Sequence, residues 1–255
     1  MTASTVLILG GTGEGRRLAD LLRVELPGAH VVSSLAGRIA TPRHPAGSVR
    51  VGGFGGVGGL ATWLREHRVC AVVDATHPFA ARISAAAAEA TAACGVPLLA
   101  LRRRAWSPGS GDDWRCVDSM EEAAALVRTI ASRVLLTVGR QELGAFAGDR
   151  HTWFLARCVD HPDPPLPARV EVLLDRGPYT VAAERALLDE RGIDAVVTKN
   201  SGGPATAAKL TAARERALPV VMVRRPACPH DVPEVSDVDA AVAWVRHRLA
   251  VPADH

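Results

Sequence analysis

Residues 6–22 read VLILGGTGEGRRLADLL, and this stretch decides the fold class. Four apolar residues lead into a cluster of glycines, which is followed by a segment carrying Leu18, Leu21 and Leu22. The apolar run predicts a buried strand, and the leucine spacing predicts an amphipathic helix. A strand joined to a helix by glycines is typical of the first βα unit of a parallel sheet.

The same alternation continues along the first hundred residues. Short apolar runs predict buried strands at 5–9, 30–33, 48–51, 70–75 and 97–101. Longer segments rich in Ala, Leu and Arg predict helices near 14–25, 57–68 and 79–94. Strands that alternate with helices indicate an α/β fold whose parallel sheet is covered by helices on both faces.

The composition changes at residues 102–115, RRRAWSPGSGDDWR, which are charged and rich in Pro, Gly and Ser. We interpret 103–115 as a linker between a domain at 1–102 and a second α/β domain of similar size at 116–255. Strands of the second domain are expected at 134–138, 153–159, 170–174, 195–198 and 220–223. The spacing of Ser119 to Glu122 and of Ser236 to Asp239 predicts N-terminal helix caps. Whether the last helix, 237–249, packs on the first domain stays open.

Composition narrows the class of protein. Of 255 residues, 48% are hydrophobic and 22% charged, as in an ordinary globular protein. A net charge of +3 is too small to predict nucleic-acid binding but fits an anionic small ligand. Five scattered cysteines without a C-x-x-C pair suit a reducing cytoplasm, and no apolar run is long enough for a membrane span. The histidines lack ligand partners at metal-site spacing, so we expect no metal.

The glycine loop is the sharpest local motif. Glycines permit a tight turn and close approach to a pyrophosphate, while the free N–H groups of the helix start face that group. We therefore assign cofactor binding to Gly10, Gly11, Thr12, Gly13, Glu14 and Gly15. The spacing departs from G-x-G-x-x-G because position 16 is Arg, and Arg16-Arg17 also breaks the phosphate-loop pattern of nucleotide hydrolases. A glycine-rich turn without a ligand is the alternative.

The second strand indicates which dinucleotide is bound. NAD-specific sites carry Asp or Glu at its end to bond the ribose hydroxyls. Here the stretch 30–38, HVVSSLAGR, holds no carboxylate and offers Ser33, Ser34 and Arg38. Hydroxyls and a guanidinium suit a 2′-phosphate, so we predict NADPH. A polar turn with a solvated arginine is the alternative.

The fourth strand leads into VVDATHPFA, residues 72–80. In open parallel sheets the ligand lies at the carboxyl ends of the strands. Thr76 is therefore a candidate cofactor contact, and Asp74 and His77 are candidate catalytic residues. A helix cap for Asp74 and a structural role for His77 are the alternatives.

The second domain contains VTKNSGGPATAAK at 197–209, which holds both lysines of a chain otherwise using Arg. A lysine ammonium is compact and mobile and can donate a proton, whereas a guanidinium is a fixed and permanently charged fork. We expect Lys199 to be catalytic. The candidate substrate contacts are Arg140, Asn200, Ser201, Gly202, Gly203 and Lys209. Ordinary strand-end and helix-surface lysines are the alternative.

Taken in order, the motifs resemble the precorrin-6A reductase family of cobalamin biosynthesis. The resemblance is carried by LILGGTGEGRRLA (7–19), SSLAGR (33–38), VVDATHPFA (72–80), VGR (138–140), TKNSGG (198–203), AAKL (207–210) and PVVMVRRP (219–226). The combination of DATHPFA with TKNSGG is more specific than the glycine loop.

This resemblance implies two Rossmann-like domains with a cleft between them. It implies NADPH-dependent reduction of one carbon–carbon double bond of precorrin-6A, giving precorrin-6B. The glycine loop and the 33–38 turn would hold NADPH, while the TKNSGG loop and Lys209 would face the carboxylate-rich tetrapyrrole. We expect no nucleic-acid or membrane partner, and transient contacts with neighbouring pathway enzymes stay open.

Three alternative functions can be distinguished by the residues or the activity that they require. A short-chain dehydrogenase needs Tyr and Lys four residues apart, but the lone tyrosine is Tyr179 and position 183 is Ala. A regulatory module that binds NADP without chemistry would oxidise no NADPH with any tetrapyrrole. Another NADP-dependent reductase of the Rossmann class stays open as well.

Overall fold

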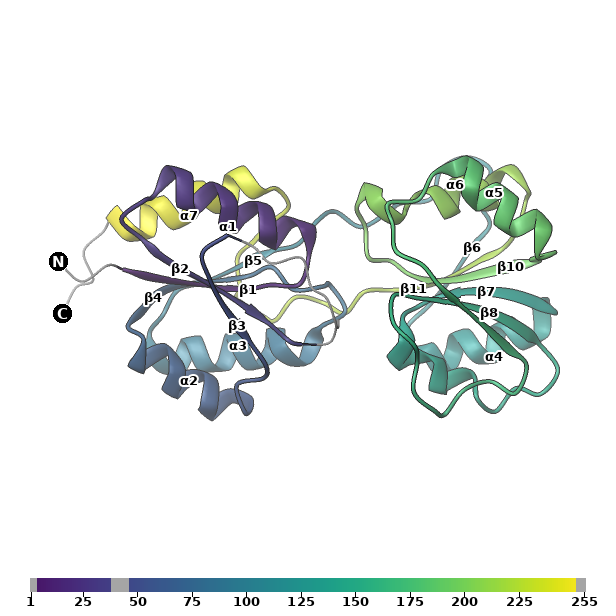
Figure 1. Cartoon of the computed structure of the whole chain (residues 1–255), viewed down its shortest axis with the longest axis horizontal. Helices are drawn as coiled ribbons and strands as arrows, with labels where there is room; N and C mark the ends of the chain where they lie inside the picture. The colour runs from purple at the N-terminus through teal and green to yellow at the C-terminus, as the bar shows by residue number, and fades with distance from the viewer. Residues whose placement is uncertain (1–3, 38–45, 251–255) are drawn as a thin grey trace. The chain divides into compact units, whose positions relative to one another are not determined.

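The computed structural model describes residues 4–37 and 46–250. Contacts divide the chain into two compact units, the first formed by 1–103 with 226–255 and the second by 104–225. Each unit contains a six-stranded parallel sheet with helices on both faces (Figure 1). The predicted α/β class with two helix-covered parallel sheets is confirmed.

The first sheet has the strand order β12-β5-β4-β1-β2-β3. Its strands are β1 (Thr5–Leu9), β2 (His30–Leu35), β3 (Ser48–Val51), β4 (Val69–Asp74), β5 (Leu98–Leu101) and β12 (Glu234–Val235). This is the doubly wound order of dinucleotide-binding folds, in which the chain reverses direction between β1 and β4. The sheet is covered on one face by α1 (Gly13–Glu25) and α7 (Val238–Ala250), and on the other by α2 (Gly56–Glu66) and α3 (Ala81–Cys94) (Figure 1).

Alternation along β1 supplies both apolar cores of the first unit. Val6 and Ile8 pack with α1 and α7, whereas Leu7 and Leu9 pack with α2 and α3. All four side chains are at most 2% exposed. Because successive side chains of a strand point to opposite faces, a continuous apolar run is what a sheet covered on both faces requires.

The second sheet has the order β6-β11-β10-β7-β8-β9. Its strands are β6 (Trp114–Val117), β7 (Arg133–Thr137), β8 (Trp153–Cys158), β9 (Val170–Leu174), β10 (Ala195–Lys199) and β11 (Val220–Val223). The helix α4 (Met120–Ile130) covers one face, and α5 (Val181–Glu190) and α6 (Ala208–Glu215) cover the other (Figure 1). Two short 3-10 segments, η1 (Arg140–Phe146) and η2 (Pro204–Thr206), follow β7 and β10.

Both sheets have the same spatial order of strands, but the outermost strand comes last along the chain in the first unit and first in the second. β6 precedes the other strands of the second sheet, and β12 rejoins the first sheet after the second unit is complete. β12 pairs with β5 through Glu234 and Val235. The chain therefore passes between the units twice, at 103/104 and at 225/226.

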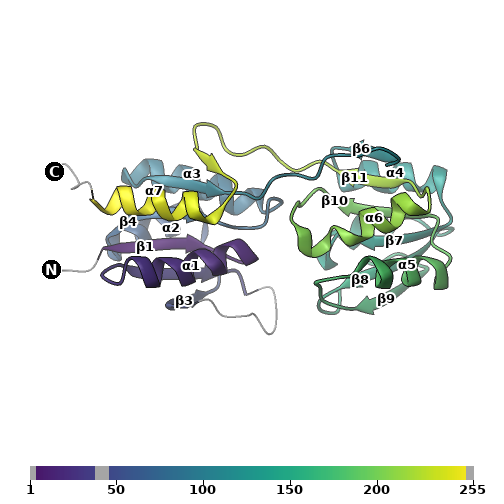
Figure 2. The same ribbon diagram turned by 90° about the horizontal axis from the view of Figure 1, so that it is seen from above.

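This division differs from the predicted domain boundaries. Most of the expected linker belongs to the second unit, because β6 begins at Trp114 and pairs with β11. The last helix belongs to the first unit, where α7 packs beside α1 (Figure 2). β12 has only two residues and therefore gives almost no sequence pattern. For this reason the sequence did not predict that residues 226–255 belong to the first unit.

The helix caps were predicted in part. The Ser119 hydroxyl accepts a hydrogen bond from the Glu122 N–H at 3.0 Å, as the capping-box spacing predicted. At the last helix the prediction was wrong, because the Asp237 carboxylate, not Ser236, accepts the Ala240 N–H at 2.8 Å.

Within 4–37 and 46–250, no helix is both long and apolar enough to cross a bilayer. The same residues contain no group of three His, Cys, Asp or Glu side chains placed to hold a metal ion.

The packing of α7 can be tested by one matched pair of substitutions. Val245 is fully buried in the core between α7 and the sheet, whereas Val24 on α1 is 78% exposed. Val245→Ala should lower the free energy of unfolding by about 1–2 kcal/mol, because it removes buried methyl groups and leaves a cavity. Val24→Ala should change it by less than about 0.5 kcal/mol. Urea unfolding measures both, and equal effects would contradict this packing.

Candidate functional site

The glycine loop is tied to the end of the fourth strand. Thr12 caps α1, because its hydroxyl accepts the Gly15 N–H at 3.1 Å and donates to the Ala75 carbonyl at 2.7 Å. Gly11 has φ +122°, which favours glycine. A Cβ on Gly15 would lie 3.2 Å from the Ala75 Cβ, so a larger residue would crowd the helix against the strand. The loop thus has the turn and the close helix–strand approach that a pyrophosphate site needs.

Glu14, a predicted cofactor contact, has a protein partner in the structure. Its carboxylate lies in the first turn of α1 and forms an ion pair of 3.1 Å with Arg103. An acidic side chain at a helix N-terminus is favourable by itself. This contact supplies a structural reason for the glutamate.

The end of β2 carries the two serines that were predicted to bind the 2′-phosphate of the cofactor. The Ser33 hydroxyl is buried, without a hydrogen-bond partner among the described residues, and the residue is 1% exposed. The Ser34 hydroxyl accepts a hydrogen bond from Arg50 at 3.1 Å. The third predicted contact, Arg38, lies outside the described residues.

Arg50 is a candidate that sequence reasoning missed. It lies on β3 directly opposite Ser34, so both side chains come to the same edge of the sheet. Its guanidinium also donates to the carbonyls of Gly52 (2.7 Å) and Gly53 (2.8 Å) and lies 3.7 Å from the centre of the Phe54 ring. Burial lowers the pKa of Arg50. The three bonded oxygens are uncharged, so these bonds orient the guanidinium without neutralising it. The sequence signal that could have identified it is an arginine near the end of β3, the strand that follows β2.

The loop after β4 is held by its own hydrogen bonds. Asp74 is 6% exposed, and its Oδ1 accepts from the Thr76 N–H (3.0 Å) and from the Thr76 hydroxyl (2.7 Å). The His77 Nδ1 accepts the Phe79 N–H at 3.3 Å. The Thr76 hydroxyl, predicted to contact the cofactor, donates to Asp74 in the structure and orients its carboxylate.

Lys199 lies at the point where the second sheet reverses direction. It ends β10, next to β7, and its ammonium lies 3.4 Å from Glu142 Oε1 in η1. Arg140 begins η1 and donates to the His161 carbonyl at 3.4 Å. In this fold the reversal point is where ligands bind, so Lys199 and Arg140 are well placed as substrate contacts. The carboxylate of Glu142 was not identified from the sequence, where η1 gave no helical pattern.

The rest of the TKNSGG loop contacts the protein itself. The Asn200 side chain accepts from the Trp106 N–H (2.9 Å) and donates to the Trp106 carbonyl (3.0 Å). The Trp106 indole N–H donates to the Gly203 carbonyl at 3.0 Å. A Cβ on Gly202 would come within 2.1 Å of the Arg104 carbonyl. Three of the predicted substrate contacts therefore fix this loop against the segment that enters the second unit.

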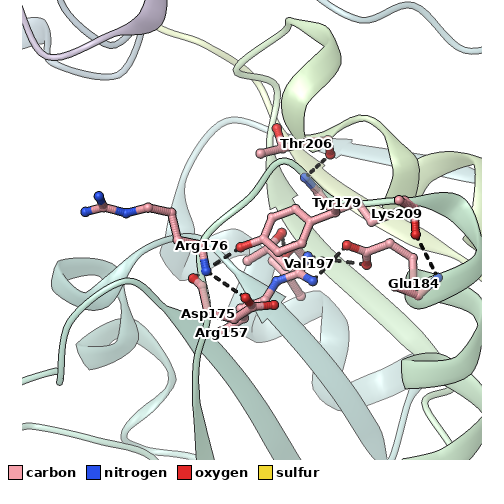
Figure 3. A network of polar contacts seen from close by, with 11 residues as sticks. Arg157, Asp175, Arg176, Tyr179, Glu184, Val197, Thr206 and Lys209 are labelled. Carbon is pink, nitrogen blue, oxygen red and sulfur yellow. Dashed lines mark hydrogen bonds and ion pairs between the residues drawn. The ribbon is translucent and has the colours of Figure 1, made fainter. Parts of the chain in front are cut away.

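Lys209 points into the second unit, where a network of charged groups is buried (Figure 3). It is 3% exposed, and its ammonium donates to the Thr206 carbonyl at 2.7 Å. Nearby, Arg157 forms a two-point ion pair with Glu184 (2.7 and 3.3 Å) and lies 3.9 Å from the centre of the Tyr179 ring. Burial, reinforced by the charge of Arg157 and opposed by Glu184, lowers the pKa of Lys209 to about 7.

The predicted residues thus fall into three groups. The glycine loop, Ser34 and the Asp74–His77 loop share the carboxyl edge of the first sheet. Lys199, Arg140 and Ser201 share the carboxyl edge of the second sheet. The side chains of Asn200 and Lys209 and the backbone of Gly202 and Gly203 make contacts inside the second unit.

Comparison with known proteins gives a consistent result. A family model described as "Precorrin-6x reductase CbiJ/CobK" matches residues 5–246. A "Precorrin-6A reductase" of Rhodococcus erythropolis is 52% identical, covering 94% of this chain and 96% of that protein. One of Mycobacterium tuberculosis is 50% identical with the same coverage. These matches confirm the resemblance drawn from the motifs.

Two further comparisons concern the structure and the name of the substrate. A solved structure named "CobK precorrin-6A reductase" has a TM-score of 0.88 at 38% identity, covering 98% of this chain and 99% of that one. Proteins named "Cobalt-precorrin-6A reductase", including one of Priestia megaterium, are only 27–29% identical.

The buried lysine should make stability depend on pH. Lys209 titrates near pH 7 in the folded chain but near its ordinary value of 10.5 when unfolded, so the unfolded chain binds more protons between these values. Stability therefore rises with pH in this window and is lost as pH falls toward 7. Between pH of about 7 and 9, wild type should gain about 1–3 kcal/mol relative to Lys209→Met. Urea unfolding at each pH measures the difference; parallel pH curves would contradict a titrating buried ammonium.

Proposed function

Because the chain belongs to the precorrin-6x reductase family CbiJ/CobK, we propose that it reduces one carbon–carbon double bond of precorrin-6A with NADPH. The product would be precorrin-6B, an intermediate of cobalamin biosynthesis. The observation that carries the nucleotide half of this proposal is the carboxyl edge of the first sheet. There the Thr12-capped glycine loop lies between the Ser34–Arg50 pair and the Asp74 loop.

The preference for NADPH over NADH rests on charge. A 2′-phosphate adds negative charge at the end of β2, where Arg50 presents a positively charged guanidinium bonded to Ser34. The strand β2, His30–Leu35, contains no carboxylate that would repel this phosphate. Ser33 is too deeply buried for direct contact, so we assign the phosphate to Ser34 and Arg50, with Arg38 as an untested third contact.

The proposed mechanism divides the work between the two sheets. When bound, the dihydronicotinamide supplies a hydride to the macrocycle. Lys199 donates the proton or stabilises the charge that develops on the ring, and Glu142 at 3.4 Å orients its ammonium. Asp74 and His77 remain second candidates for the proton. Catalysis then requires that NADPH and the macrocycle are bound at the same time.

On the substrate side we revise the predicted set. Lys199, Arg140 and Ser201 are proposed to bind the acetate and propionate carboxylates, for which fixed positive charges and hydroxyl donors are suited. Asn200, Gly202, Gly203 and Lys209 are proposed to hold the loop that carries Ser201, since their contacts lie inside the unit. The substrate is proposed to be metal-free, because the relatives named for the cobalt form are much less similar.

Mixing the protein with NADPH and precorrin-6A tests the reaction directly. Wild type should oxidise NADPH as the tetrapyrrole absorption changes. Lys199→Ala should lower kcat by about 10²–10⁴-fold while the Kd of NADPH stays within about twofold. Lys199→Arg separates the roles, since retained turnover would assign charge stabilisation and lost turnover proton donation. No NADPH oxidation by wild type would favour a regulatory NADP-binding module, and equal loss of turnover and NADPH affinity would place Lys199 at the cofactor.

Cofactor preference can be tested with Arg50→Met. The substitution should weaken NADPH binding by about 10–100-fold, because one charge-assisted contact to the 2′-phosphate is lost. NADH, which lacks this phosphate, should be affected less than about threefold. Arg65→Met is the matched control, because Arg65 is an exposed arginine on α2 whose side chain donates to the Ala93 carbonyl. Titration calorimetry measures these affinities; an equal loss for both nucleotides would contradict the assignment.

A further inference from the structure

Three groups from separate parts of the second unit bind the backbone around η2, the 3-10 segment that follows the TKNSGG loop. They are the Trp106 indole N–H, which donates to the Gly203 carbonyl at 3.0 Å, the Tyr179 N–H, which donates to the Ala205 carbonyl at 3.3 Å, and the Lys209 ammonium, which donates to the Thr206 carbonyl at 2.7 Å. All three bonds hold the end of the loop that follows Lys199, so the position of this loop depends on the three donors.

Lys209 is the charged donor of the three. It is the second residue of α6, is 3% exposed, and its Nζ lies 5.0 Å from the centre of the Trp106 ring. A hydrogen bond from a charged donor is about twice as strong as one from a neutral donor, and attraction to the face of an aromatic ring requires the positive charge. Loss of the proton would therefore weaken both the bond to Thr206 and the contact with Trp106.

Trp106 connects Lys209 to the residue beside Lys199. The Trp106 N–H donates to the Asn200 side chain at 2.9 Å, and the Trp106 carbonyl accepts from the same side chain at 3.0 Å. Asn200 directly follows Lys199 in the chain. The Lys209 ammonium thus acts at both ends of the loop 200–206, directly at η2 and through Trp106 at Asn200.

Two charged side chains face Lys209, namely Arg157 from β8 and Glu184 from α5 (Figure 3). Because these two form an ion pair with each other, Glu184 does not neutralise Lys209 alone. Burial, and then the charge of Arg157, lowers the pKa of Lys209 to about 7 against the opposing charge of Glu184. Burial raises the pKa of Tyr179, whose ring covers Arg157. Lys209 therefore gains or loses its charge near neutral pH, while Tyr179 stays neutral.

Resting on the proposed function, we propose that Lys209 is a positioning residue: its ammonium holds the loop 200–206 in the position that binds the carboxylates of the tetrapyrrole, and loss of its proton weakens that binding. The KM of precorrin-6A is then low while Lys209 is protonated and rises as the pH rises through the pKa of Lys209. By linkage, the bound tetrapyrrole must favour the protonated lysine. A tenfold preference for the ammonium form raises the midpoint of its titration by about one pH unit.

The lysine content of the chain allows a direct test by NMR. Lys199 and Lys209 are its only lysines, so protein labelled with ¹³C-lysine gives two side-chain signals, which Lys199→Ala assigns. In wild type without ligands, the amide signals of Gly202 and Gly203 should shift with the same midpoint as the Lys209 signal, near pH 7. These shifts should be absent in Lys209→Met. Loop signals that do not follow the Lys209 titration would overturn the inference.

The kinetic test compares the KM of precorrin-6A in wild type and Lys209→Met between pH of about 6 and 8.5. The ratio of the two values cancels the titration of the substrate and of Lys199. This ratio should be about 5–10 at the low end and less than about twofold at the high end, while kcat changes less than about twofold. Arg185→Met removes an exposed cation of α5 that pairs with Glu215, and should keep the wild-type pH dependence. A ratio that does not depend on pH would reduce Lys209 to a structural residue and overturn the inference.

Glu184→Gln provides a second variant that leaves Lys209 in place. It keeps an oxygen for Arg157 but removes the negative charge that raises the pKa of Lys209. The midpoint of the Lys209 titration and the pH at which KM rises should both move to lower values by the same amount. Movement of one without the other would contradict the proposed link.

Binding of precorrin-6A without NADPH separates failure of this inference from failure of the proposed function. In wild type, the bound tetrapyrrole should raise the midpoint of the Lys209 titration by about 0.7–1 pH unit. An unchanged midpoint with precorrin-6A bound would overturn the inference and leave the proposed function intact. If the loop signals follow Lys209 but wild type does not bind precorrin-6A, the proposed function fails and the link between Lys209 and the loop stands.

Discussion

The pairing of the outermost strand is the constraint on which both sheets depend. An unpaired sheet edge leaves backbone N–H and C=O groups without partners. Here β12, which follows the second unit along the chain, pairs with β5, and β6, the first strand of the second unit, pairs with β11. The two segments that connect the units, at 103/104 and 225/226, are held by side-chain hydrogen bonds. Asn200 holds Trp106 through two hydrogen bonds, and Arg102 holds the Pro226 carbonyl.

The hydrogen bonds that hold these connecting segments also lie close to the candidate sites. The residues that hold the two connecting segments adjoin the proposed ligand-binding edges: Asn200 follows Lys199, and Arg102 and Asp74 lie together at the ends of β5 and β4. A loop fixed at several points loses less conformational freedom when a ligand binds, and such preorganisation strengthens binding. The structural and chemical roles of these motifs are therefore combined in neighbouring residues.

The sequence predicted the strands with long apolar runs, because a strand buried on both faces of its sheet needs an apolar residue at nearly every position. It also located the glycine loop, Ser34, Asp74 and Lys199 at strand ends. Arg50 was missed because its proximity to Ser34 depends on the pairing of β2 with β3. Glu142 was missed because it lies in a 3-10 segment, and Arg102 because its partners are far along the chain. The burial of Lys209 depends on packing around α6, which no local pattern encodes.

The late return of β12 and α7 to the first unit also determines when the protein can fold during its synthesis. A nascent chain that has been made only as far as β5 has the four central strands of its first sheet and β3, but α1 still lacks the helix that packs beside it. The second unit, by contrast, has all of its strands as soon as β11 leaves the ribosome. The half of the chain that is translated first is thus the last to be completed, and its uncovered apolar face must persist through the synthesis of the other half.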